Sequence, residues 1–330
     1  MLNLDNPEIQ FALDAVRQAS LLTKQVQAEM VSPALTKTDR SPVTVADFAA
    51  QALIGYLITE TFPNDPLIGE EDSAALQTPE ERETLSRVTQ FVGRFTDGAA
   101  PETVSRWIDR GAGQTANRFW TLDPVDGTKG FLRGDQYAIA LALIVEGKLQ
   151  VGVLGCPNLS DGYRPDVGGP GSILVAIRGE GAWGTPLEGD PDFQRLHVSE
   201  QSDPAQARLL RSFESGHTNV SQIDFLADEM DIKADPVRMD SQAKYAVLAA
   251  GQAEIYLRLL SSDRPNYREK IWDQAAGALI TIEAGGRVTD LDGKPLDFTA
   301  GRTLAHNRGV CATNGHLHAD TLEALQAIEA

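Results

Sequence analysis

The sequence predicts a layered fold of helices and sheets that joins an α+β half to an α/β half. In residues 137–183, short apolar runs separated by tight turns are typical of an antiparallel sheet. From about residue 209 onward, short strands alternate with helical segments, which favours a layered α/β arrangement. Two prolines and two glycines in residues 184–192 indicate a linker. We therefore predict two subdomains, residues 1–185 and 186–330.

Composition and charge narrow the class of protein. With 330 residues, 42% of them hydrophobic and 23% charged, the chain has the composition of a soluble globular protein. No apolar stretch has the length of a membrane span and no secretory signal is visible, so we expect a cytoplasmic protein. Cys156 and Cys311 are expected to be free thiols. The net charge of −18 argues against nucleic-acid polymers and anionic membranes as partners, but it does not exclude a small phosphate ester bound with divalent cations.

Two helices are expected before the first strand. Asn6-Pro7 indicates a helix start, and apolar residues then recur at three- and four-residue steps along one face. Thr44 and Asp47 stand three apart before a helical pattern over residues 48–61, which resembles a capping box. On these local grounds Asp47 caps a helix, although a carboxylate in a first turn is also well placed to orient a metal-bound water.

An apolar strand is predicted over residues 67–69, and it runs directly into Glu70-Glu71-Asp72. A solvated loop is the usual explanation of three adjacent acids, because like charges repel unless something positive gathers them. The end of an apolar strand is also a place where carboxylates are presented to metals. Residues 78–95 then predict an exposed amphipathic helix, and residues 97–114 a connection.

The central motif is W-T-L-D-P-V-D-G-T-K-G-F at residues 120–131. Its proline biases Asp123 toward an extended geometry, and its Gly-Thr pair lets the chain turn sharply after Asp126. The two carboxylates and the carbonyl of Val125 can then converge, and such oxygen ligands suit Mg²⁺. Asp-Pro and Asp-Gly are also ordinary turn dipeptides, so the motif alone leaves both interpretations open.

The remaining elements follow from apolar runs and turn residues. Residues 129–135 predict a polar turn. Strands are predicted at 137–146, 148–154, 172–178, 181–183, 209–213, 237–239, 254–260, 287–290 and 310–313, and helices at 221–230, 241–250, 274–283 and 319–328. Asp240 can cap the helix that starts at Ser241, and Gly251 can end it.

Four separated acidic positions need one explanation, and they are Asp47, Glu70-Glu71, Asp123 with Asp126, and Asp273. Taken together, G-E-E-D at 69–72, D-P-V-D-G-T at 123–128 and W-D-Q-A-A-G at 272–277 resemble the lithium-sensitive, magnesium-dependent phosphatases, the superfamily of inositol monophosphatase and fructose-1,6-bisphosphatase. Further motifs, among them E-S-G-H at 214–217, M-D-S-Q-A-K-Y at 239–245 and K-I-W-D at 270–273, resemble its 3'(2'),5'-bisphosphate nucleotidase branch.

The resemblance implies a layered αβαβα sandwich of the sugar-phosphatase type with a site for two or three Mg²⁺ ions. The implied metal ligands are Glu70, Asp123, the carbonyl of Val125, Asp126 and Asp273, with Glu71 in support. Asp47 and Thr128 are implied to hydrogen-bond the water that attacks phosphorus.

The same resemblance implies how a nucleotide is held. The matching positions are His217, Ser241, Lys244 and Arg258, joined on the substrate side by Thr128 and Asp273. A second phosphate away from the metals would need such cationic groups. Taken locally, Ser241 and Lys244 are simply the first turn of a helix, and Arg258 is a strand position that points at solvent.

The implied activity is that of a phosphoric monoester hydrolase that removes the 3'-phosphate of adenosine 3',5'-bisphosphate, giving AMP and phosphate. 3'-Phosphoadenosine 5'-phosphosulfate is a candidate second substrate, and lithium sensitivity and a place in sulfur assimilation are implied as well. Two alternatives stay open. One is a phosphatase for inositol monophosphate or inositol 1,4-bisphosphate, and the other is a non-catalytic protein that uses the same acids as a Ca²⁺ or Mg²⁺ site. The sequence predicts neither an oligomeric state nor a redox role for the cysteines.

Overall fold

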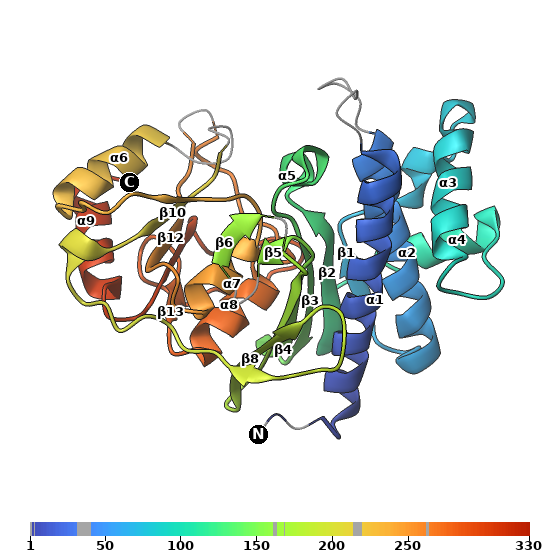
Figure 1. Cartoon of the computed structure of the whole chain (residues 1–330), viewed down its shortest axis with the longest axis horizontal. Coiled ribbons are helices and arrows are strands. Elements are labelled where there is room, and N and C mark those ends of the chain that lie inside the picture. The colour runs from blue at the N-terminus through green and yellow to red at the C-terminus, as the bar shows by residue number, and fades with distance from the viewer. Residues whose placement is uncertain are drawn as a thin grey trace.

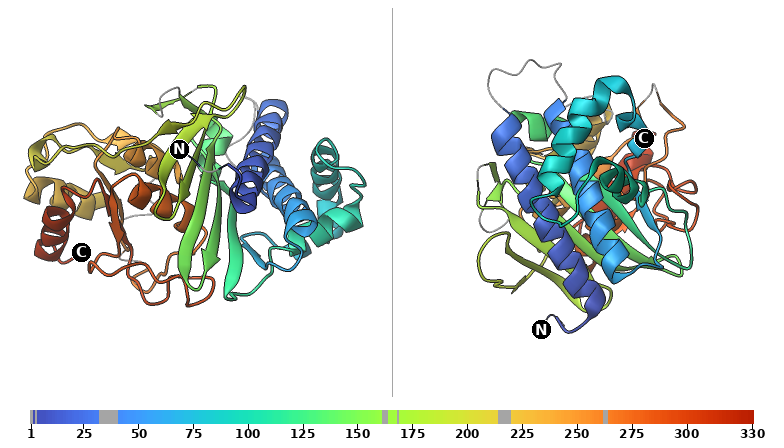
Figure 2. Two further views of the ribbon diagram at one scale, coloured as in Figure 1. Left: turned by 90° about the horizontal axis from the view of Figure 1, so that it is seen from below. Right: turned by 90° about the vertical axis from the view of Figure 1, so that its right-hand side faces the viewer.

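The computed structural model describes residues 2, 4–31, 41–160, 164–167, 169–213, 220–261 and 264–330. In this part of the chain, helices and sheets alternate in five layers, which the left view of Figure 2 shows side by side. The layers are α1 (Pro7–Met30) with α2 (Ser41–Thr61), a seven-stranded sheet, α7 (Ala243–Ala249) with α8 (Ala275–Glu283), a five-stranded sheet, and α6 (Val220–Glu229) with α9 (His318–Ala327) (Figure 1). The predicted αβαβα class is therefore confirmed.

The first sheet is antiparallel except at one edge. Its strands, in spatial order, are β1 (Leu67–Gly69), β2 (Arg118–Asp126), β3 (Ala138–Val145), β4 (Lys148–Cys156), β7 (Ser172–Ile177), β8 (Gly181–Pro186) and β9 (Gln194–Arg195). β1 and β2 are parallel, whereas the other neighbouring pairs are antiparallel. The predicted hairpins β3–β4 and β7–β8 are confirmed. Glu146 and Gly147 turn the first of them with positive φ angles, as a two-residue hairpin loop requires.

α1 and α2 cover one face of this sheet with apolar side chains. Asn6 caps α1 as predicted, because its side chain accepts hydrogen bonds from the backbone N–H groups of Glu8 and Ile9 at 2.9 and 3.3 Å. Phe11 on α1 packs edge-on against Trp120 on β2, with ring centroids 5.0 Å apart. Burial of these side chains holds the helix layer against the sheet.

Two further helices, α3 (Arg82–Val92) and α4 (Pro101–Asp109), pack against α2 on the side away from the sheet (Figure 1). α3 lies in the stretch predicted as an amphipathic helix. The expectation that residues 97–114 form only a connection is wrong. Pro101 begins α4, and Val104 and Ile108, one turn apart, are fully buried.

α7 and α8 fill the space between the two sheets (Figure 1). α8 reads A-A-G-A-L-I-T-I-E, almost without polar residues, as expected of a helix covered on both sides. Close packing requires its glycine, because a Cβ atom on Gly277 would lie 2.1 Å from the ring of Tyr245 on α7. The middle layer therefore depends on small residues that let its two helices approach.

The second sheet is smaller and mixed, and it lies in the half of the chain for which a layered α/β arrangement was expected. Its strands, in spatial order, are β11 (Val237–Arg238), β10 (Leu209–Arg211), β12 (Ile255–Arg258), β14 (Val310–Thr313) and β13 (Arg287–Thr289). β10 is parallel to β11 and β12, and β14 is antiparallel to β12 and β13. The short elements are strands β5 (Leu159–Ser160) and β6 (Arg164–Val167) and the 3₁₀ helices Ser73–Leu76, Pro79–Glu81 and Pro204–Gln206.

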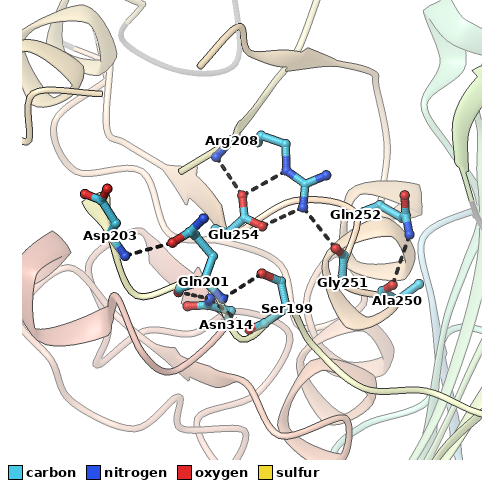
Figure 3. A network of polar contacts seen from close by, with 9 residues as sticks. All are labelled: Ser199, Gln201, Asp203, Arg208, Ala250, Gly251, Gln252, Glu254 and Asn314. Atoms are coloured by element: carbon cyan, nitrogen blue, oxygen red, sulfur yellow. Dashed lines mark hydrogen bonds and ion pairs between the residues drawn. The ribbon is translucent and has the colours of Figure 1, made fainter. Parts of the chain in front are cut away.

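A polar network fastens the segment after β9 to the second sheet (Figure 3). The Asn314 amide, 1% exposed, donates hydrogen bonds to the carbonyl oxygens of Ser199 and Gln201 at 3.0 and 2.7 Å. Beside it, the Arg208 guanidinium pairs with the buried carboxylate of Glu254 at 2.6 Å. These contacts tie an irregular segment to regular structure.

Three smaller expectations concern the chain as a whole. β9 still belongs to the first sheet, and the division of the chain at residue 185 stays a prediction. Cys156 and Cys311 are free, as predicted, and both are buried. Among the residues described, no helix is both long enough and apolar enough to cross a membrane.

Candidate functional site

The two aspartates of the central motif lie on either side of a β-bulge. Asp123 on β2 is paired with Ala140, and Asp126 with Ala138, so three steps on β2 match two on β3. In a regular strand, residues three apart point to opposite faces of the sheet. The extra residue of the bulge lets both carboxylates reach the same side, and Pro124 is tolerated there. Burial, Glu70 and then Asp126 raise the pKa of Asp123 well above its usual value.

The turn after Asp126 brings the two halves of the chain together. Gly127 has a φ of 99°, and a Cβ atom on it would lie 2.7 Å from the Cβ atom of Ser241. The backbone N–H of Gln242 donates a hydrogen bond to Asp126 Oδ2 at 2.6 Å. Thr128 then begins the helix α5 (Thr128–Arg133), so the polar turn predicted at 129–135 is wrong over most of its length.

Asp47 reaches the same region from α2. The capping-box interpretation of Thr44 and Asp47 is wrong, because α2 already begins at Ser41 and Asp47 lies in its second turn. Burial of the Asp47 carboxyl group, followed by the charges of Glu71 and Glu70, raises its pKa well above the usual value. The Asp47 side chain therefore faces the acidic segment after β1.

Glu70 and Glu71 arrive beside Asp123 because β1 and β2 are parallel. Gly69 is paired with Leu122, so the next residue of each strand is an acid at the same edge of the sheet. Burial and then Glu70 raise the pKa of Glu71 to about 7. Glu70 as a whole residue is exposed, yet desolvation of its carboxyl group by burial, followed by the charge of Asp126, raises its pKa too. The solvated-loop interpretation holds for Asp72, which is exposed and caps a 3₁₀ helix.

Asp273 completes the group from the second half of the chain, two residues before α8. Burial and then Asp126 raise its pKa well above the usual value, while Arg258 acts in the opposite direction. Asp273 in turn raises the pKa of Asp123. The four separated acidic positions of the sequence thus meet in one place. Asp126 lies at its centre, since its charge contributes to the raised pKa of all four partners, Asp47, Glu70, Asp123 and Asp273.

One oxygen of this group has no partner among the described residues. Asp123 is 2% exposed, and its Oδ1 atom makes no hydrogen bond there. A buried, unpaired carboxylate oxygen among other carboxylates is costly unless a cation is bound. The donor set consists of oxygens only, which fits a hard cation such as Mg²⁺. Within the described ranges, no three His, Cys, Asp or Glu side chains stand close enough to hold an ion as they are, so the carboxylates would have to turn inward.

Lys244 and Ser241 lie next to this acidic group. Lys244 is 2% exposed, and its ammonium donates a hydrogen bond to Ser212 Oγ at 2.9 Å. Burial and then the charge of Arg258 lower its pKa to about 8. The prediction that Asp240 caps the following helix is wrong, because its carboxylate binds Arg133 and the Phe213 N–H instead.

The N-cap residue of α7 is Gln242, whose side chain makes no capping hydrogen bond, while the Ser241 Oγ atom before it accepts a hydrogen bond from the Ala243 N–H at 3.1 Å. Ser241 is buried and has a φ of 68°, a left-handed conformation that is unusual for serine. The backbone here is therefore fixed in a strained turn beside the acidic group.

Its place in the strand suggested that Arg258 points at solvent, but the structure shows it mostly enclosed. Its side chain is 18% exposed, and its Nη2 atom lies 3.0 Å from the Glu269 carboxylate. Gln274 donates to the same carboxylate oxygen at 2.9 Å and accepts from the Tyr245 hydroxyl at 2.5 Å. The Glu269 carboxylate, itself held by Gln274, therefore fixes the orientation of the Arg258 guanidinium. His217 lies outside the described residues.

Sequence reasoning missed several residues of this region. Glu269 precedes the W-D motif by three positions, and its partner Arg258 lies eleven residues before it, a spacing without a signal. Gln51, on α2, contacts the backbone of Glu71 and looks like any polar residue of a helix. Phe213 is exposed, and its ring centroid lies 5.5 Å from the guanidinium carbon of Arg133.

Comparison with known proteins places this geometry in context. The model of the inositol monophosphatase family matches residues 5–330. The chain is 42% identical to a 3'(2'),5'-bisphosphate nucleotidase of Schizosaccharomyces pombe, over 97% of this chain and 95% of that one. It is 40% identical to a 3'(2'),5'-bisphosphate nucleotidase of Oryza sativa, over 97% and 93% of the two chains.

Two solved structures share the fold at low identity. An IMPase of Thermotoga maritima has a TM-score of 0.64 and 20% identity, and the match covers 98% of each chain. SuhB of Mycobacterium tuberculosis has a TM-score of 0.63 and 23% identity, with 97% of this chain and 96% of that one covered. These likenesses extend over the whole layered arrangement described above.

Proposed function

The chain belongs to the inositol monophosphatase family, and from that premise we propose that it is a phosphatase that removes the 3'-phosphate of adenosine 3',5'-bisphosphate. The relatives named above at 40–42% identity, which it matches over nearly their whole length, are 3'(2'),5'-bisphosphate nucleotidases. The observation that carries the proposal is the meeting of acids from four segments beside a buried lysine and an arginine.

The acids would hold two or three Mg²⁺ ions. The proposed ligands are Glu70, Asp123, the carbonyl of Val125, Asp126 and Asp273, with Glu71 in support. The unpaired Asp123 Oδ1 atom supports this assignment, as do the carboxyl groups of Glu71 and Asp123, whose pKa values are raised by burial and then by neighbouring acids. When bound, Mg²⁺ would neutralise the phosphate, lower the pKa of water and stabilise the leaving oxygen.

Asp47 and Thr128 would act on the attacking water. The Asp47 carboxylate approaches the acidic group from α2, and the exposed Thr128 begins α5 just after Asp126. In the proposed reaction, the carboxylate accepts the proton of the water and the hydroxyl aims its lone pair at phosphorus. No side-chain nucleophile takes part, so water displaces the 3'-oxygen in line and no phosphoenzyme forms. The departing 3'-oxygen takes a proton from solvent and becomes the 3'-hydroxyl of AMP.

The 5'-phosphate would lie away from the metals, against Lys244 and Arg258. Lys244 is buried and close to half-protonated near pH 8, so an arriving dianion would favour its charged form. Arg258 is presented in a fixed orientation by Glu269. Ser241 and His217 are proposed to contact the nucleotide as well, together with Thr128 and Asp273 on the side of the reacting phosphate.

Initial rates test the proposal against its alternatives. Phosphate release is measured at saturating Mg²⁺ from adenosine 3',5'-bisphosphate, 3'-phosphoadenosine 5'-phosphosulfate, inositol 1-phosphate and inositol 1,4-bisphosphate, with a chelator as control. We expect the nucleotide to be preferred. A tenfold preference for an inositol ester, about 1.4 kcal/mol of transition-state binding, would reverse the substrate assignment. Absence of phosphate release with every substrate and metal would favour a non-catalytic metal-binding protein.

A further inference from the structure

A buried glutamine joins the helix that carries Asp47 to the segment that carries Glu70 and Glu71. Gln51 lies one turn after Asp47 on α2 and is completely buried. Its Oε1 atom accepts a hydrogen bond from the Glu71 N–H at 3.0 Å, and its Nε2 atom donates to the Glu71 carbonyl at 2.6 Å. The amide therefore satisfies both backbone groups of Glu71, as a neighbouring strand would.

The same amide also reaches the end of α4. Gln51 Nε2 donates a second hydrogen bond to the Ile108 carbonyl at 2.9 Å. That carbonyl belongs to the last turn of α4 and also accepts a hydrogen bond from the Gly111 N–H at 2.9 Å. One side chain thus ties α2, α4 and the acidic segment together through three hydrogen bonds to backbone atoms.

Two glycines make room for this amide. A Cβ atom on Gly69 would lie 2.4 Å from Gln51 Oε1, and a Cβ atom on Gly111 would lie 2.4 Å from Gln51 Nε2. Neither glycine has a positive φ, so both positions require glycine for lack of space and not for backbone conformation. The amide is therefore confined on two sides and has little freedom to take another orientation.

A second group holds the acidic segment from the other half of the chain. The Arg302 guanidinium donates a hydrogen bond to the Gly69 carbonyl, and it lies 4.8 Å from the ring centroid of Trp272, the residue before Asp273. Gln51 on one side and Arg302 on the other thus fix the backbone on both sides of Glu70. Such contacts behind metal-binding carboxylates set their position and affinity.

We propose that Gln51 is a positioning residue, which sets the place of Glu70 and Glu71 relative to Asp47. This inference rests on the proposed function, since it assigns Gln51 to that same site. Asp47 and Gln51 are four residues apart and share one face of α2, so the hydrogen bonds to Glu71 fix the distance between the water-activating carboxylate and the acids after β1. A misplacement of about 1 Å there would cost on the order of a hundredfold in rate.

The test compares Gln51→Leu with a matched control, Asn314→Leu. Asn314 is likewise buried and lies outside the acidic group, and its amide donates hydrogen bonds to the carbonyl oxygens of Ser199 and Gln201 (Figure 3). Its Oδ1 atom accepts a third hydrogen bond from the Leu317 N–H at 3.2 Å. Three quantities are measured for the full chain: kcat, KM for adenosine 3',5'-bisphosphate, and the Mg²⁺ concentration that gives half of the maximal rise in Tm without nucleotide.

We expect Gln51→Leu to lower kcat and weaken the Mg²⁺ response of the Tm, each by about 10-fold to 100-fold, with little change in KM. Asn314→Leu is expected to lower the Tm in the absence of metal but to keep the parent kcat and Mg²⁺ response. If Gln51→Leu behaves like the control, the amide is merely structural and the inference is overturned.

A second variant covers the case that Gln51→Leu does not fold. Gly111→Ala leaves the glutamine in place but pushes its Nε2 end away, and we expect the same loss of kcat and of Mg²⁺ response. Parent-like values in a folded Gly111→Ala would overturn the inference. A parent protein that responds to Mg²⁺ without hydrolysing the nucleotide would contradict the proposed function alone, because the Mg²⁺ response of the variants still tests Gln51.

Discussion

Replacing Gly127 with alanine tests the contact that joins the two halves of the site. Gly127 has a φ of 99°, and the added Cβ would lie 2.7 Å from Ser241 Cβ and 3.2 Å from the Gln136 carbonyl oxygen. The left-handed backbone costs a residue with a Cβ atom about 1–2 kcal/mol. Crowding of packed atoms adds about 1–3 kcal/mol. We therefore expect Gly127→Ala to lower the free energy of unfolding by about 2–5 kcal/mol.

The same variant should also lose activity beyond its loss of stability. Moving the Ser241 segment away from Gly127 would stretch the hydrogen bond from the Gln242 N–H to Asp126, which is 2.6 Å long. Asp126 lies at the centre of the acidic group, so both Mg²⁺ affinity and kcat are expected to fall. These are measured on folded protein, well below its unfolding temperature.

Gly134→Ala is the matched control at the other end of α5. Gly134 has a φ of 69°, but a Cβ atom on it would meet nothing within 4 Å. Only the backbone cost of about 1–2 kcal/mol applies, and activity should be unchanged. Urea unfolding of both variants gives the comparison. Equal losses of stability, or full activity in Gly127→Ala, would refute the reasoning.

Three further predictions concern protons and metal. Burial and Glu70 raise the pKa of Glu71 from its ordinary 4.5 to about 7, so the metal-free protein should lose stability as the pH rises through this range. Mg²⁺ should remove that loss. Urea unfolding with and without Mg²⁺ checks both expectations. Burial lowers the pKa of His318 to about 4, so the free energy of unfolding should fall as the pH drops from 6.5 through 4. If the free energy of unfolding of His318→Gln falls just as steeply over this pH range, the prediction is wrong. Asp47→Asn should keep Mg²⁺ binding but lose about 10²–10⁴-fold in kcat. Asp126→Asn should instead weaken Mg²⁺ binding itself, which titration calorimetry measures. Equal Mg²⁺ affinity in Asp126→Asn and the parent would contradict the assignment.

The sequence predicted those parts of the fold that depend on neighbouring residues. The β3–β4 hairpin followed from two apolar runs and a turn pair, and the start of α1 from Asn6-Pro7. The acidic residues at the ends of β1 and β2 were also found, since each follows an apolar run. Their convergence at one edge became visible only with the parallel pairing of Gly69 and Leu122.

Several of the missed features depend on partners that are distant in the sequence. The first turn of α2 carries no apolar pattern, so Asp47 was mistaken for a cap. Asp240 reads as a helix cap, but Arg133 competes for its carboxylate across more than a hundred residues. Gln51 carries no local signal at all, because its three hydrogen-bond acceptors and donors are backbone atoms that tertiary packing brings to it.

The most direct test of the account is a crystal of this protein soaked with Mn²⁺ in place of Mg²⁺ and examined by anomalous diffraction. Mn²⁺ prefers the same oxygen ligands as Mg²⁺ and gives a signal that identifies each ion. We predict two or three peaks within coordination distance of Glu70, Asp123, Asp126 and Asp273. Peaks bound only elsewhere on the molecule, with these four carboxylates left without metal, would contradict the central claim.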